Sequence, residues 1–555
     1  MEPRHYRFWP RNLPRELSLP RTSLFYNLEV SAARFPDKPA VIFYDTPLTY
    51  ADLKSQSERL AGFLQQRCAV ARGDRILLFM QNSPQFVVAY YGCLRAGAIV
   101  VPVNPMNLTE ELRHYVTDSG AAVALTGQEL FPQVKPLLAQ VLQHAIVAAY
   151  RDYVTRATDL TLPDAVSADR QDMHETGVTL WCDALAAGLA PGPDRAGPDD
   201  LCVMPYTSGT TGRPKGCIHT HATVMSTVII MSEWGGGHQD NVILGTLPLF
   251  HVTGMQGSMN VPIYLGATTV LMSRWDRDTA AQLIQRYRID GWTNIATMAI
   301  DFLANPKLAS YDLSSLSRIG GGGAAMPEAV AQRLKEMTGL DYIEGYGLSE
   351  TMAPTHINPD ERPKKQCLGI PICNTDSRVI NPDTLQELGP GEVGEIVSSG
   401  PQIFKGYWKN PEATAACFIQ LDGKPFFRTG DLGRYDEEGY FFIVDRLKRM
   451  INASGYKVWP AEVESMLYAH PDIQEACIIG TRDAHRGETV KAVVVLKAAS
   501  RGKVSPEEII GWCRSHMAAY KIPRVVELVD SLPKSATGKV QWRLLQEREL
   551  NEGTT

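Results

Sequence analysis

The residues best suited to binding a phosphate chain lie together in the stretch YTSGTTGRPKG, residues 206–216, which follows an apolar run at residues 201–205. Glycine admits positive-φ conformations, so that successive backbone N–H groups can surround an anion, and serine and threonine hydroxyls can bind the same anion. Lys215 adds one cation. A Walker loop is excluded, because Pro214 stands where that motif needs its second glycine and Gly216 follows the lysine. We therefore predict a phosphate-binding loop of another kind.

The whole of residues 206–216 resembles the signature loop of the acyl-adenylate-forming superfamily, which includes acyl-CoA synthetases, adenylation domains of peptide synthetases and luciferases. A flexible surface linker is the alternative, and the interleaved Arg213, Pro214 and Lys215 argue against it. The resemblance implies an ATP site, and it extends from about residue 23 to Arg543 with the further motifs in family order. The cofactor-binding residues expected in this loop are Thr207, Ser208, Gly209, Thr210, Thr211 and Lys215.

A glycine-rich stretch at residues 318–327 is the next motif. Its Gly320, Gly322 and Ala325 satisfy the loose G-x-G-x-x-A dinucleotide pattern, so a dehydrogenase-like or regulatory nucleotide-binding protein stays an alternative. The similar family stretch lines the nucleotide and acyl sites, where absent side chains let ligands lie against the backbone. By resemblance, the residues expected there are Gly322, Gly323 and Ala324.

The octet EGYGLSET, residues 344–351, is the second strong match to the superfamily. An aromatic ring can stack on adenine, a hydroxyl can bond the α-phosphate, and a carboxylate can hold Mg²⁺, which prefers oxygen ligands beside phosphates. By resemblance, Tyr346, Thr351 and Glu350 take these three roles in that order. Glu344 and Gly345, which begin the octet, are expected in the same nucleotide site.

Three further residues depend on the resemblance for their roles. His251 ends the stretch PLFH, and a single histidine at such a place is more often structural. Synthetases of this kind place a histidine or an aromatic residue between the acyl pocket and the thiol tunnel, so His251 is a candidate catalytic gate. A carboxylate can accept both hydroxyls of a ribose, and Asp431 in RTGDL matches the family's ribose ligand. Arg446 matches the family arginine near ribose and phosphate.

The resemblance also predicts a mobile C-terminal domain, with its hinge at Lys448. Lys539, in PKSATGK, is the expected adenylation catalyst, because an ammonium beside the substrate carboxylate and the α-phosphate would stabilise the charge that develops between them. Lys534 lies in the same stretch and serves as its control. The residues expected beside coenzyme A after rotation are Gly455, Tyr456 and Lys457.

Alternating strand and helix patterns position these motifs. Ser23 is expected to cap a helix over residues 25–33, and residues 49–66 predict a long helix. Short apolar strands between helices imply a mainly parallel sheet covered on both faces, so the fold class is α/β. Residues 152–200 predict an irregular surface connection with a short helix at residues 180–189.

The expected domains follow from a change of pattern along the chain. Residues 1–447 form an N-terminal adenylating domain, in which short strands and turns from about residue 370 predict a β-rich subdomain. Residues 448–555 form a small mobile α+β domain.

Composition bounds the class of protein. Lys+Arg of 55 against Asp+Glu of 61 gives a net charge of -6, which does not support binding to nucleic acid or an electrostatic membrane anchor. Ten cysteines without a CxxC pair indicate reduced thiols rather than a disulfide framework or a zinc site. Residues 1–22 show no apolar signal region, and no run approaches the roughly 18 apolar residues of a membrane span. We expect a cytoplasmic protein without a transmembrane segment.

The resemblance implies an ATP-dependent carboxylic acid:CoA ligase that works through an acyl-AMP intermediate, with ATP, Mg²⁺ and coenzyme A as cofactors. Gly254, Gly257 and Ser258, together with the glycines of residues 320–323, predict room for an aliphatic tail. We expect an aliphatic or hydroxy fatty acid of short to medium length. The alternatives are a long-chain fatty acid, and an acyl-AMP ligase that loads a carrier protein in trans.

The expected partners are small molecules, namely the carboxylic acid and coenzyme A. A homodimer is an open hypothesis. Acetylation of Lys539 by a lysine acetyltransferase is a second hypothesis, because it would remove the charge assigned to catalysis.

Overall fold

The computed structural model describes residues 3–207, 214–323, 325–446, 449, 451–453, 456–458, 460–483, 487–534 and 540–552. The chain divides into two compact units, one made of Met1–Ser377 and Ser398–Phe427 and the other of Arg378–Val397 and Arg428–Thr555. Among the helices of these described ranges, none is long and apolar enough to cross a membrane. This division starts the C-terminal unit before the boundary predicted at Lys448, which lies outside the described residues and stays a prediction.

A nine-stranded sheet forms much of the first unit, and its central strands β1, β13, β12, β14, β15 and β16 are mutually parallel neighbours. The outer pairs β1–β2, β16–β17 and β17–β18 are antiparallel. In spatial order the strands are β18 (Ile370–Pro371), β17 (Ala353–Ile357), β16 (Tyr342–Leu348), β15 (Arg318–Gly322), β14 (Gly291–Asn294), β12 (Val242–Gly245), β13 (Thr268–Leu271), β1 (Pro39–Phe43) and β2 (Thr46–Thr49).

A seven-stranded sheet forms a second layer of this unit. All its neighbours are parallel except β11 and β8. In spatial order its strands are β11 (His219–Thr220), β8 (Leu201–Val203), β4 (Ile99–Pro102), β3 (Arg75–Phe79), β5 (Val123–Gly127), β6 (His144–Ala148) and β7 (Val178–Leu180). Strand β7 lies in the segment predicted to be irregular, and its three residues are too few to show a periodic pattern.

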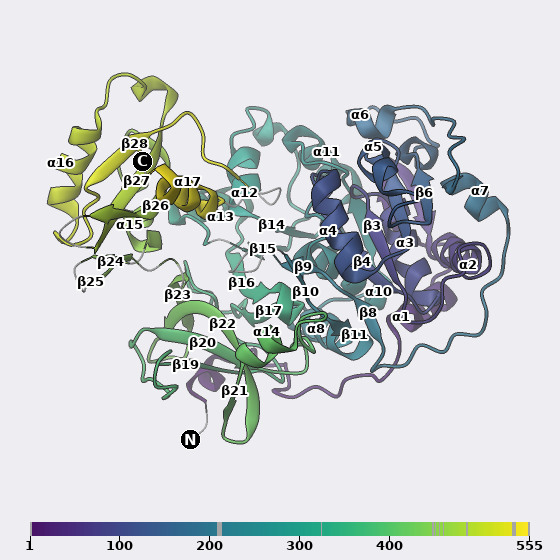
Figure 1. Ribbon diagram of the computed structural model, residues 1–555, viewed down its shortest axis with the longest axis horizontal. Coiled ribbons are helices and arrows are strands. Elements are labelled where there is room, and N and C mark those ends of the chain that lie inside the picture. The colour runs from purple at the N-terminus through teal and green to yellow at the C-terminus, as the bar shows by residue number, and fades with distance from the viewer. Residues whose placement is uncertain are drawn as a thin grey trace. The chain divides into compact units, whose positions relative to one another are not determined.

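Helices cover both sheets, as Figure 1 shows for α3 and α4 beside β3 and β4. The predicted cap is confirmed, because the Ser23 hydroxyl accepts a hydrogen bond from the backbone N–H of Tyr26 at the start of α1. Thr49 caps α2 in the same way. The longer helices of this unit are α1 (Leu24–Arg34), α2 (Tyr50–Gln66), α3 (Pro84–Arg95), α4 (Thr109–Ser119), α8 (His221–Trp234), α11 (Arg277–Tyr287), α12 (Ala296–Leu303) and α13 (Glu328–Thr338).

Shorter helices complete the first unit. One continuous helical segment consists of α9 (Val252–Met255), a π-helical turn at Gln256–Asn260 and α10 (Val261–Leu265). The other short helices are α5 (Phe131–Val134), α6 (Asp164–Ser167), α7 (Trp181–Ala186) and α14 (Pro411–Ala416). Buried side chains of α1, α2, α3, β1 and β12 belong to one hydrophobic cluster. The α/β fold class is confirmed.

The β-rich part of the chain contains β19 (Asp376–Ile380), β20 (Gly394–Ser399), β21 (Phe418–Leu421), β22 (Lys424–Tyr435) and β23 (Phe441–Arg446). In the C-terminal unit, the strand order is β25-β24-β27-β26, with β28 parallel to β27. The elements of this α+β part are β24 (Ile451–Ala453), β25 (Tyr456–Val458), α15 (Pro460–Leu467), β26 (Ile473–Asp483), β27 (Gly487–Leu496), α16 (Pro506–His516), β28 (Val525–Leu528) and α17 (Trp542–Glu552).

Candidate active site

The base of the predicted phosphate loop is a two-stranded ladder of β9 (Tyr206–Thr207) and β10 (Lys215–Gly216). Thr207 is the Cα partner of Lys215 across this ladder. Helix α4 supports it from one side, because His114 Nε2 lies 2.9 Å from the Pro214 carbonyl oxygen and the Tyr206 hydroxyl donates to Asp118 at 2.6 Å. Two predicted phosphate ligands, Thr207 and Lys215, therefore face each other where the loop begins and ends.

The glycine-rich strand β15 ends beside β16 at the carboxyl edge of the nine-stranded sheet. Gly322 is the Cα partner of Gly345, and a Cβ on Gly322 would lie 2.3 Å from the Gly345 carbonyl oxygen. A Cβ on Gly321 would lie 1.9 Å from the carbonyl oxygen of Asn294. Gly323 has φ of +86°, a conformation that favours glycine. A side chain at position 321 or 322 would meet neighbouring backbone, so the strand requires glycine there, and room for an acyl tail beside residues 320–323 stays a prediction.

Glu344 fixes the backbone around this edge. Its buried carboxylate accepts hydrogen bonds from the backbone N–H groups of Met326 at 3.2 Å and Gln366 at 2.8 Å. Burial raises the pKa of Glu344 to about 7, and the backbone hydrogen bonds oppose that rise. The carboxylate thus connects the segment after the glycine-rich strand with the segment after β17.

The end of β16 and the turn after it carry the residues predicted to bind adenine and the α-phosphate. The ring of Tyr346 is buried and its centroid lies 5.7 Å from that of His356. The Thr351 hydroxyl accepts from the backbone N–H of Leu348 at 2.8 Å and donates to the Ala353 carbonyl oxygen at 2.7 Å. Thr351 is fully buried, so its hydroxyl holds the turn together. Its contact with an α-phosphate stays a prediction.

Ser349 is a candidate that the sequence analysis missed. Its side chain is half-buried, and its hydroxyl makes no hydrogen bond among the residues that the structure describes. Its carbonyl oxygen lies 2.8 Å from Nε2 of the buried His219. The octet itself contained the signal, because Ser349 directly precedes the carboxylate assigned to the metal.

Glu350 fits the requirements of Mg²⁺. Its side chain is buried, and its Oε1 accepts a hydrogen bond of 2.8 Å from the Tyr407 hydroxyl. Mg²⁺ usually takes one or two carboxylates and completes its shell with water and substrate phosphates. Within the described part of the chain, no group of three or more His, Cys, Asp or Glu residues could hold a metal alone. Glu350 as the single carboxylate beside the predicted phosphate site agrees with this usual coordination of Mg²⁺.

His251 is held at the start of α9 by contacts on both sides of its loop. The backbone N–H of Thr253 donates to His251 Nδ1 at 3.4 Å. Asn82, buried just after β3, donates to the Leu247 carbonyl oxygen at 3.0 Å and accepts from the Leu249 N–H at 2.8 Å. Asn82 was not predicted, although a polar residue a few positions past the carboxyl end of a buried strand is a signal that could have found it.

The two glycines near His251 differ in the space around them. A Cβ on Gly254 would lie 2.3 Å from the Pro248 carbonyl oxygen, so this position has no room. A Cβ on Gly257, in the π-helical turn, would be 3.8 Å from Thr293 Oγ1 and 3.9 Å from Met231 Cε. Of these two positions, only Gly257 supports the predicted space for an acyl chain.

In the C-terminal unit, the buried Asp431 of β22 is the Cα partner of Arg446 in β23. Tyr456 and Lys457 lie in β25. Lys534, the control lysine, forms an ion pair of 2.6 Å with Glu475. The predicted residues outside the described ranges are Ser208, Gly209, Thr210, Thr211, Ala324, Lys448, Gly455 and Lys539.

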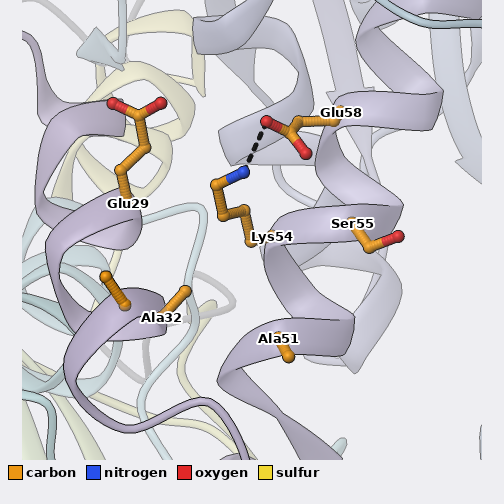
Figure 2. Close-up of a pocket in the computed structure, with 7 residues that line it drawn as sticks. Glu29, Ala32, Ala51, Lys54, Ser55 and Glu58 are labelled. Atoms are coloured by element: carbon orange, nitrogen blue, oxygen red, sulfur yellow. Dashed lines mark hydrogen bonds and ion pairs between the residues drawn. The ribbon is translucent and has the colours of Figure 1, made fainter.

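A separate surface pocket of about 260 Å³ lies between α1 and α2. Figure 2 shows Lys54 directed at Glu58, with which it forms an ion pair of 2.7 Å. The lining residues are Glu29, Ala32, Ala33, Ala51, Lys54, Ser55 and Glu58. This pocket contains no predicted site residue, and we assign it no role in the chemistry.

Comparison with known proteins identifies the family of the chain. The family described as AMP-binding enzyme matches residues 28–408, and the AMP-binding enzyme C-terminal domain matches residues 462–539. A long-chain-fatty-acid–CoA ligase of Bacillus subtilis (strain 168) is 37% identical over 553 residues, which cover 98% of this chain and 97% of that protein. A feruloyl-CoA synthase of an Amycolatopsis species is 35% identical over 509 residues, which cover 91% of this chain and 94% of that protein.

Solved structures show the same fold. ATP-bound MatB from Rhodopseudomonas palustris has a TM-score of 0.83 at 27% identity and covers 95% of this chain and 99% of its own. The anthranilate CoA ligase AuaEII, in complex with anthranoyl-AMP, has a TM-score of 0.82 at 26% identity, and the match covers 97% of this chain and 99% of that structure's chain. ATP and coenzyme A are therefore the cofactors, and Mg²⁺ is standard for the family. The chain belongs to the AMP-binding enzyme family and is an AMP-forming, ATP-dependent acid:CoA ligase of the acyl-adenylate-forming superfamily.

Proposed function

We propose that this ligase activates an aliphatic fatty acid in two half-reactions. In the first, a carboxylate oxygen attacks the α-phosphorus of ATP, and the bond to the β-phosphate breaks as pyrophosphate leaves. In the second, the sulfur of coenzyme A attacks the acyl carbon, AMP leaves, and the thiol proton is released. The fatty acid carboxylate is a poor acyl donor until its oxygen is part of this mixed anhydride.

The observation that carries the proposal is the carboxyl edge of β15 and β16. Gly322 and Gly345 are paired there without side chains, Tyr346 follows Gly345 in β16, and the turn that carries Glu350 comes next. Ligands of open α/β sheets bind outside the carboxyl ends of the strands. Backbone groups exposed at these glycines support contact with a nucleotide and an acyl group, and a bound Mg²⁺ would neutralise phosphate charge beside Glu350.

The remaining roles are proposals that follow the family motifs. Asp431 and Arg446 bind ribose and phosphate, and His251 gates the passage between acyl pocket and thiol. Lys539 promotes adenylation, and Lys448 is the hinge. The other proposed ligands of ATP or coenzyme A are Thr207, Ser208, Gly209, Thr210, Thr211, Lys215, Gly323, Ala324, Glu344, Thr351, Gly455, Tyr456 and Lys457.

Space beside Gly257 supports an aliphatic chain, because the thioether of Met231 borders that space. The relative named long-chain-fatty-acid–CoA ligase favours the long-chain alternative over the short to medium length that the sequence predicts. An aromatic acid is the second candidate, and the relative named feruloyl-CoA synthase favours it.

The decisive experiment measures CoA-dependent AMP release with straight-chain, hydroxylated, branched and aromatic acids. We expect the highest kcat/KM with an aliphatic acid. Lys539→Ala should abolish acid-dependent ATP–pyrophosphate exchange, and Lys534→Ala, which loses only the ion pair with Glu475, should retain it. Turnover of aromatic acids alone would contradict the fatty acid assignment. Pyrophosphate release without thioester would indicate a ligase that loads a carrier protein.

Localisation and regulation are further parts of the proposal. All ten cysteines are unpaired, which supports a reducing compartment such as the cytoplasm. We propose that acetylation of Lys539 silences adenylation, because it removes the ammonium charge. Unchanged exchange after stoichiometric acetylation would contradict this. Sedimentation of the purified protein tests the homodimer.

A further inference from the structure

Residues 404–408 connect two parts of the proposed nucleotide site. Three backbone hydrogen bonds of 2.8 to 2.9 Å join them to residues 216–218, the strand that leaves the phosphate loop. The backbone N–H of Phe404 also donates to the Glu350 carbonyl oxygen at 2.8 Å. This segment therefore fixes the turn that carries Glu350 against the end of the phosphate loop.

Tyr407 makes the same connection with its side chain. Its hydroxyl donates to Glu350 Oε1 at 2.8 Å, and its ring centroid lies 4.9 Å from Lys215 Nζ. The Lys215 ammonium makes no hydrogen bond or ion pair within the ranges that the structure describes. One tyrosine thus contacts both the proposed metal ligand and the proposed phosphate-binding cation.

The surroundings of Tyr407 allow its side chain little freedom. Its backbone N–H donates to Thr414 Oγ1 at 2.9 Å, and the Phe404 ring packs edge-on at 4.9 Å. Gly406, directly before it, has φ of +137°, and a Cβ there would lie 2.7 Å from Thr414 Cγ2. The close backbone turn that places Tyr407 therefore requires glycine at position 406.

We propose that Tyr407 is a positioning residue that orients the Glu350 carboxylate toward Mg²⁺ and holds the Lys215 ammonium for the phosphate chain. This inference depends on the roles of Glu350 and Lys215 in the proposed function. A hydroxyl bonded to one carboxylate oxygen sets the direction of the other, as outer partners of metal ligands commonly do. The ring attracts the ammonium through its π face and leaves the N–H groups of Lys215 for phosphate oxygens.

The first test separates the hydroxyl from the ring. Tyr407→Phe removes only the contact with Glu350, whereas Tyr407→Leu removes both contacts. Tyr287→Phe is the matched control, because its hydroxyl donates to the Asp45 carboxylate at 2.5 Å, away from the proposed site. The probe is α,β-methylene ATP, whose α–β bridge the enzyme cannot cleave. Its binding is measured by calorimetry at increasing Mg²⁺ and again with a chelator.

We expect Tyr407→Phe to raise the Mg²⁺ concentration for half-maximal stimulation of binding by about tenfold. In the presence of the chelator, Tyr407→Phe should bind the analogue with the affinity of wild type, since its ring still faces Lys215. Tyr407→Leu should weaken binding in both conditions, and Tyr287→Phe should change neither. A Mg²⁺ requirement of Tyr407→Phe equal to wild type would overturn the inference while leaving the proposed function intact. If binding of the analogue by wild-type protein does not depend on Mg²⁺, the proposed metal site and this inference are both overturned.

A double-mutant cycle with Glu350→Gln shows whether Tyr407 acts through that carboxylate. Residues that share one interaction have non-additive effects. We therefore expect Tyr407→Phe to cause no further loss of Mg²⁺-stimulated binding once Glu350 is Gln. Additive losses would show that the hydroxyl acts elsewhere and would overturn the assignment.

Discussion

The Nε2 nitrogen of His219 lies 2.8 Å from the carbonyl oxygen of Ser349, which joins the strand after the phosphate loop to the turn that carries Glu350. His219 is fully buried, and burial lowers its pKa to about 4. The neutral ring must therefore carry its proton on Nε2 to donate to the carbonyl, while Nδ1 faces the Thr223 hydroxyl at 3.2 Å.

Replacing His219 should weaken ATP use specifically. His219→Leu removes the shorter of the two hydrogen bonds to the Ser349 carbonyl oxygen and leaves only that from the Met352 N–H at 3.3 Å, which costs about 0.5–1.5 kcal/mol. We expect KM for ATP to rise about tenfold, since 1.4 kcal/mol corresponds to one decade. His219→Gln, which can donate from its amide, should recover part of the loss. Steady-state kinetics with ATP and acid varied in turn check this. An equal rise in KM for the acid would indicate general damage instead.

Ser349 and Thr351 should respond differently to loss of their hydroxyls. Thr351→Val removes the bonds to Leu348 and Ala353 inside the buried turn, so we expect a lower melting temperature. Ser349→Ala removes a hydroxyl without a partner in the described structure, so stability should stay unchanged. If that hydroxyl contacts the α-phosphate, the exchange rate falls by about 10²-fold.

Thermal unfolding and ATP–pyrophosphate exchange of both variants check this contrast. A stable Thr351→Val protein with strongly reduced exchange would instead support the role that the sequence analysis gave Thr351. Normal exchange by Ser349→Ala would exclude its hydroxyl from the chemistry.

Local patterns predicted the elements, but contacts between distant segments needed the structure. Ser23 and the run after it predicted α1 because a cap and an apolar face are encoded within a few residues. The contact of Tyr407 with Glu350 spans 57 residues, and that of Asn82 with Leu249 spans 167. No periodic pattern encodes such pairs. The sequence identified the glycines as important. Only the structure shows whether the position of the missing side chain is empty or is filled by the backbone of a neighbouring segment.

Substitutions at Gly257 and Gly254 should separate substrate selection from stability. Gly257→Leu fills space beside Thr293 and Met231, so we expect kcat/KM to fall most for the longest accepted acid. One methylene in such a pocket changes discrimination by about 10–200-fold. Gly254→Ala forces a Cβ against the Pro248 carbonyl oxygen, so we expect a loss of about 1–3 kcal/mol in protein stability. The order of preference among the acids should stay that of wild type. Acid panels and urea unfolding check both variants. An unchanged chain-length profile in Gly257→Leu would place the acyl chain elsewhere.

Buried histidines should make the fold sensitive to acid. His221 Nδ1 accepts a hydrogen bond of 3.1 Å from the backbone N–H of Leu24, and burial lowers its pKa from 6.5 to about 4. The unfolded chain therefore binds a proton at higher pH than the folded chain does. Stability from this group is fully present above pH 6.5 and is lost as the pH falls toward 4.

Substituting His221 by Asn tests this dependence, because the amide oxygen can still accept from Leu24 but does not titrate. The pKa of His221 is 6.5 in the unfolded chain and about 4 in the folded chain. Linkage therefore predicts that wild type loses roughly 2 kcal/mol of unfolding free energy from this residue between about pH 7 and pH 5. Urea unfolding at the two pH values should show a smaller decrease in His221→Asn. His174→Asn, at an exposed position, is the control and should behave as wild type. An identical decrease in wild type and His221→Asn would show that other groups cause the acid sensitivity.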